Sequence, residues 1–116
     1  MQTDKRMRLE KAGMDVAGAL ERFMGNDALL ERFLNKFVSD SNYEKLAAAI
    51  DAEDKETALT AAHTLKGVCG NLAMTELFDL LTKQVAAFRA DDWEGGKAIM
   101  PSIVSAYEQI IDAIKA

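Results

Sequence analysis

Apolar residues recur at helical spacing along almost the whole chain, and this pattern limits the possible folds more than any other feature. Leu30, Leu34 and Phe37 show it in one segment, and Ile103 and Ile110 show it in the last. No segment alternates apolar and polar residues as a half-buried strand does. Helices that bury one stripe each and are joined by short linkers pack in alternating directions. The sequence therefore predicts an all-α antiparallel four-helix bundle with an additional short N-terminal helix.

Polar residues at the segment boundaries predict where the helices begin. Asn26, Asp54 and Asp92 each precede an apolar-periodic run and are residues that cap a helix N-terminus well. The stretch from Ser41 to Glu44 fits a capping box, in which the two side chains satisfy free backbone amides. Pro101 interrupts the last pattern, so we expect a kink or a break in that helix.

The chain is expected to hold one domain. Residues 1–12 are highly charged and have only Met7, Leu9 and Ala12 to bury, so they are predicted to form a charged N-terminal extension that frays or makes a loose helix. Residues 13–116 are assigned to the bundle, and 49% hydrophobic content is enough for a single core.

Charge and cysteine usage exclude several classes of function. The net charge is -5 and basic residues form no stripe, so nucleic acid and membrane surfaces are poor partners. No apolar run reaches the ~20 residues of a membrane span, and we expect a soluble, cytoplasmic monomer. Cys69 is the only cysteine and lies on an apolar stripe, so we interpret it as a core residue.

The only histidine, His63, lies on the outward face of the helix expected over residues 54–70. At ~100° per residue, a sector of about 60° holds the apolar positions, which are Ala58, Ala62, Leu65 and Cys69. Gly67 and Gly70 share the face of the histidine, although a glycine inside a helix costs roughly 0.5 to 1 kcal/mol relative to alanine. Bare backbone there would let a second macromolecule bring its reactive group to the imidazole.

This stretch resembles the signature of the histidine-containing phosphotransfer (HPt) domains of multistep phosphorelays. It reads His63-x-Leu65-Lys66-Gly67 and then Gly70-Asn71-Leu72. The resemblance covers roughly residues 13 to 115. It implies that His63 accepts a phosphoryl group from a receiver-domain aspartate and passes it to another receiver domain. The implied partners are the receiver domains of hybrid histidine kinases and of response regulators.

Each residue near His63 has an expected role. The imidazole is the phosphorylated group, and Lys66 stabilises the charge of the phosphoryl group. The docking surface for the partner is expected from residues on the same face, namely Leu59, Thr60, Gly67 and Gly70. Attack by one ring nitrogen requires a polar partner that fixes the other. Gln84 and Thr82, from the following helix, are candidates for this partner, and water is the alternative.

The sequence argues against autonomous catalysis. It has no glycine-rich phosphate loop and no evident cluster for ATP and magnesium, so we expect a phosphohistidine carrier rather than an enzyme. No cofactor and no metal site are expected in this chain, and the Mg²⁺ would belong to the receiver domain.

Three other functions are alternatives for a chain of this kind. One is a helical adaptor that keeps the fold but only binds receiver or kinase domains. Another is a phosphotransfer module fed directly by the ATP-binding domain of a kinase. A metal or haem bundle is the third, but one histidine and scattered carboxylates give no ligand spacing.

Overall fold

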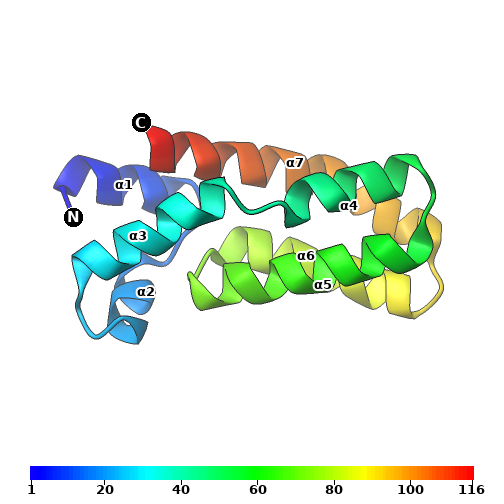
Figure 1. The fold of residues 1–116 in the computed structure, drawn as a ribbon, viewed down its shortest axis with the longest axis horizontal. Coiled ribbons are helices and arrows are strands. Elements are labelled where there is room, and N and C mark those ends of the chain that lie inside the picture. The colour runs from blue at the N-terminus through cyan, green and yellow to red at the C-terminus, as the bar shows by residue number, and fades with distance from the viewer.

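The computed structural model describes residues 1–116 as seven α-helices without a strand (Figure 1). The helices are α1 (Thr3–Lys11), α2 (Val16–Arg22), α3 (Asp27–Val38), α4 (Asn42–Asp51), α5 (Lys55–Asn71), α6 (Thr75–Arg89) and α7 (Trp93–Lys115). The prediction of an all-α fold is confirmed.

Helices α4 to α7 form the antiparallel bundle. Each packs along the next one in the chain, and α3 and α4 lie nearly end to end along the molecule (Figure 1). The other end of the molecule is covered by α1, α2 and α3, and α1 lies beside the C-terminal part of α7. The result is an elongated molecule of 42 × 24 × 20 Å, with α5 exposing one face along the bundle.

Three-residue connections set the antiparallel order of α4 to α7. The middle residue of each is left-handed: Glu53 (φ 54°), Ala73 (φ 53°) and Asp91 (φ 59°). A single residue in this conformation ends a helix and reverses the chain. The carboxylates of Asp54 and Asp92 then accept hydrogen bonds from backbone amides in the first turn of the next helix. These two caps, and that of Asn26 on α3, are confirmed.

The bundle surrounds one continuous apolar core. The expected buried stripe of α5 is confirmed, because Ala58, Ala62, Leu65 and Cys69 are all fully buried. Burial raises the pKa of the Cys69 thiol to about 12, with a smaller contribution from Asp40. The thiol therefore stays protonated at neutral pH and behaves as a small core side chain.

The N-terminal residues are more tightly bound than expected. Leu9 has no exposed surface, and α1 packs against α7. Directly after α1, the Gly13 carbonyl accepts hydrogen bonds from Glu76 N (3.2 Å) and Thr75 Oγ1 (3.0 Å). The prediction of a loose extension is wrong, because one buried leucine and the adjoining turn fix this segment onto the bundle.

One further local prediction is wrong, and one of two alternatives at Pro101 is excluded. Ser41 makes no side-chain cap for α4; instead Asp40 Oδ1 accepts hydrogen bonds from both Asn42 N and Asn42 Nδ2, each at 2.8 Å. Pro101 lies inside α7, which continues to Lys115, so the expected break is absent and a kink stays a prediction. Buried residues on both sides of the proline, such as Trp93 and Ile103, hold the helix against the core. Packing thus outweighs the loss of one backbone hydrogen bond.

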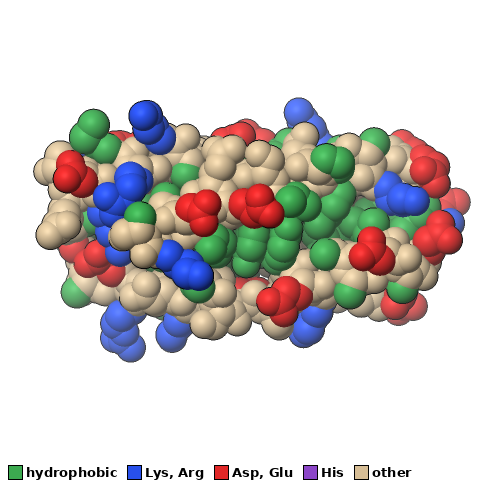
Figure 2. Space-filling view, turned by 90° about the horizontal axis from the view of Figure 1, so that it is seen from above, with side chains coloured by type: hydrophobic (Ala, Val, Ile, Leu, Met, Phe, Trp, Pro, Cys, Tyr) green, Lys and Arg blue, Asp and Glu red, His purple; other side chains and the backbone are tan.

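The surface is mixed in charge. In the view from above (Figure 2), acidic and basic side chains are interspersed, and apolar side chains gather along the middle of the molecule. No helix has the length and apolar content needed to cross a membrane.

Candidate functional site

His63 stands exposed near the middle of α5, with its neighbours one turn away on the same face. Thr60 and Gly67 are exposed and Leu59 is half-buried. The outward position of His63 follows from the helical period, because the opposite face of α5 is fully buried. The prediction of an accessible imidazole is confirmed.

The two glycines on this face differ in their surroundings. A Cβ atom added to Gly67 would meet nothing within 4 Å, whereas one added to Gly70 would lie 3.0 Å from Phe78 Cε1. The Gly70 carbonyl also accepts a hydrogen bond from the Arg22 guanidinium. Packing therefore accounts for Gly70, while Gly67 leaves bare backbone open to solvent one turn from the imidazole.

The ring partner of His63 is Arg89, near the end of α6. Arg89 Nη2 lies 3.3 Å from His63 Nδ1. Both sequence-based candidates for this contact are wrong. Gln84 is fully buried and donates from Nε2 to the Gly96 carbonyl at 3.1 Å. Thr82 Oγ1 donates to the Phe78 carbonyl of its own helix at 2.8 Å.

The reasons for this difference are geometric. Gln84 lies on the buried face of α6, so its amide reaches the backbone of α7 instead of the surface. Arg89 lies seven residues, or about two turns, beyond Thr82 on the same face. Helical side chains lean toward the N-terminus of their helix, which directs the long arginine back toward His63. The position of Arg89 on the exposed face of α6 can be predicted from the sequence. Its contact with His63 cannot, because that contact depends on how far α6 is offset along α5.

The cations beside His63 are not neutralised by carboxylates. The ion pairs of this structure join the N-terminus to Asp27, Lys5 to Glu31 and Arg6 to Glu10. Neither Lys66 nor Arg89 takes part in one. In a chain of net charge -5, this leaves two free cations around the imidazole. Such an arrangement favours an anion on the ring.

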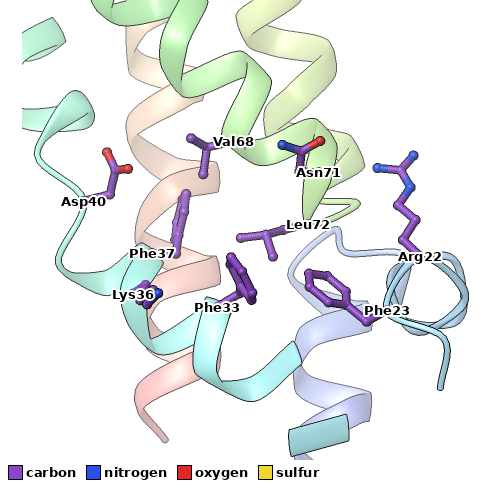
Figure 3. A pocket seen from close by; sticks show the side chains of 9 residues that line it. All are labelled: Arg22, Phe23, Phe33, Lys36, Phe37, Asp40, Val68, Asn71 and Leu72. Atoms are coloured by element: carbon purple, nitrogen blue, oxygen red, sulfur yellow. The ribbon is translucent and has the colours of Figure 1, made fainter. Parts of the chain in front are cut away.

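An apolar groove opens beyond the C-terminal half of the histidine face (Figure 3). Its volume is about 470 Å³, and it lies between α2, α3 and the end of α5. Figure 3 shows Phe33, Phe23 and Leu72 around a common space, with Arg22 and Asp40 at opposite sides. The other lining residues are Lys36, Phe37, Val68 and Asn71. Asn71 is exposed one turn beyond Gly67 on the same side of α5, so the groove adjoins the histidine face at this residue, while Val68 lies further round the helix.

Comparison with protein-family models matches residues 28–116 to the Hpt domain. The chain belongs to the Hpt domain family. The matched part of this Hpt domain includes α5, His63 and both cations, whereas α1 and α2 precede it. No curated protein and no solved structure matches the chain. The family assignment gives this protein a histidine phosphotransfer role in phosphorelays, as a phosphocarrier.

Proposed function

We propose that this Hpt domain accepts a phosphoryl group on His63 from the aspartate of a receiver domain and passes it to a second receiver domain. The observation that carries the proposal is the setting of the only histidine. His63 is exposed, has unpaired cations at Lys66 and Arg89, and lies one turn from the bare backbone of Gly67. A partner can therefore bring a phosphoryl group to bonding distance.

The transfer is a single displacement at phosphorus. The lone pair of a ring nitrogen forms the N–P bond while the P–O bond to the aspartate breaks, and its electron pair leaves on the carboxylate oxygen. The transition state is loose and rich in charge, so positioning and electrostatics dominate its stabilisation. Lys66, one turn from His63, supplies positive charge for the phosphoryl oxygens.

The test is transfer between purified proteins. The chain is incubated with radiolabelled, phosphorylated receiver domains and, separately, with labelled ATP alone. We expect label only from the receivers, and we expect the adduct to be lost in acid but kept in alkali, as a phosphoramidate is. Label from ATP alone, or an acid-stable adduct, would contradict the proposal.

The same assay distinguishes the alternative functions. Binding of phosphorylated receivers without label on this chain would indicate an adaptor. Label that requires only a kinase ATP-binding domain, with no receiver present, would indicate a module fed directly by a kinase.

We also propose that the bound receiver extends from the His63 face over the apolar groove. The support is adjacency, because Asn71 lines the groove and lies one turn beyond Gly67 on the same side of α5. Phe33 is 39% exposed at the groove, which suits contact with an apolar partner surface.

Phe33→Glu is expected to raise the Kd for the receiver about tenfold, since it places a charge in the apolar part of the interface. Isothermal titration with a receiver domain measures this. The matched control is Met7→Glu, because Met7 is 58% exposed on α1, away from the groove. Equal affinity of the two variants would show that the receiver does not cover the groove.

Lys66→Ala is expected to slow phosphoryl transfer about tenfold and to change the unfolding free energy by less than about 0.5 kcal/mol. The variant removes a cation near the developing charge, and no ion pair of the folded state is lost. Rapid-quench kinetics and thermal melting measure the two effects. A transfer rate equal to the parent would leave Lys66 with no part in the reaction.

A further inference from the structure

The contact between Arg89 and His63 restricts where the ring proton can be. A guanidinium has only N–H donors, carries no acceptor and stays charged in proteins. Arg89 Nη2, 3.3 Å from Nδ1, can therefore only donate to that nitrogen. Nδ1 must then present its lone pair, and the single proton of the neutral ring must lie on Nε2.

In this arrangement neither ring nitrogen is ready to attack phosphorus. Nε2 carries the proton and has no free in-plane lone pair, while the lone pair on Nδ1 faces the guanidinium. A partner that accepts the proton of one ring nitrogen would do the opposite and free the other nitrogen for attack. Gln84 cannot be that partner, because its Nε2 is bonded to the Gly96 carbonyl inside the bundle.

We propose that Arg89 is a positioning residue that holds His63 in the unreactive tautomer until a phosphoryl donor draws the guanidinium away. The proposal rests on the proposed function of His63. Arg89 is free to move, because it is exposed and has no carboxylate partner. The oxygens of an incoming phosphoryl group are stronger acceptors for a guanidinium than a neutral ring nitrogen. The resting chain is thereby protected from small phosphodonors.

The reactive step requires the proton to move from Nε2 to Nδ1 through solvent. Nε2 then uses its lone pair to form the N–P bond, and the bond from phosphorus to the leaving group breaks with its electron pair on that group. With phosphoramidate as donor the leaving group is ammonia. The phosphorylated ring afterwards loses the Nδ1 proton to water, and Arg89 can donate to Nδ1 again.

The first experiment measures the tautomer directly. Because His63 is the only histidine, ¹⁵N-histidine labelling gives one ring to follow, at pH ~9 where a histidine ring is neutral. We expect Arg89→Leu to increase the fraction of rings protonated on Nδ1 about two- to tenfold, the range for one lost hydrogen bond. In Arg89→Lys, which keeps a donor-only cation, this fraction should lie between those of Arg89→Leu and the parent. Lys66→Leu is the control for charge alone and should leave the tautomer unchanged.

The second experiment measures reactivity without any receiver. Each of Arg89→Leu and Lys66→Leu loses one cation that favours the phosphoryl anion, so phosphoramidate should label Arg89→Leu about two- to tenfold faster than Lys66→Leu, in proportion to the reactive tautomer. Identical ¹⁵N shifts in parent and Arg89→Leu, or labelling of Arg89→Leu no faster than that of Lys66→Leu, would overturn the proposal. The tautomer is read on the unphosphorylated protein, so a failure of transfer from receivers would contradict the proposed function without changing this result.

Discussion

Replacing His63 with glutamine is expected to abolish labelling of this Hpt domain by every phosphorylated receiver. Glutamine has no ring nitrogen that can form the N–P bond, and His63 is the only histidine in the chain. The side chain is exposed, so the unfolding free energy should change by less than about 0.5 kcal/mol. Phosphoryl transfer assays and thermal melting measure the two quantities.

The control for this variant is Lys55→Gln, an exposed position in the first turn of the same helix. It should take label at the parental rate. If His63→Gln melted like the parent and still took label, the phosphoryl group would be carried by another side chain, and the assignment of His63 would be wrong.

Gly67→Gln is expected to leave the fold intact while weakening receiver binding and phosphoryl acceptance at least about tenfold. The added side chain has room within the protein, because a Cβ atom at Gly67 meets nothing within 4 Å. Helix propensity should even raise stability, by up to about 1 kcal/mol. The same side chain stands one turn from His63, where the receiver must come close. Melting, titration and transfer kinetics measure these effects.

Gly70→Ala provides the matched contrast. Its Cβ would lie 3.0 Å from Phe78 Cε1, and this crowding opposes the gain in helix propensity, so Gly70→Ala should be less stable than Gly67→Gln. If Gly67→Gln accepted the phosphoryl group at the parental rate, the receiver would not dock on this face of α5. Unfolding of Gly67→Gln would instead mean that Gly67 serves packing, as Gly70 does.

Local periodicity determined most of the helical framework from the sequence alone. The apolar stripe of α5 fixes which face is buried, and with it the outward position of His63 and the core position of Cys69. Capping residues such as Asn26, Asp54 and Asp92 act on amides only three residues away, so their effect is readable without a fold. The phosphotransfer signature also lies within one helix and the turn after it.

Only the tertiary structure decided what lies across from each helix. The contact of Arg89 with His63, the inward hydrogen bond of Gln84 and the groove beside Phe33 all depend on the rotation and offset of one helix against another. Leu9 is buried for the same reason, since α1 packs against α7 and α2. A helical pattern specifies which side of a segment is apolar, but the packing of complete side chains sets how far neighbouring helices slide and turn. Contacts between helices therefore appear only once the whole core is assembled.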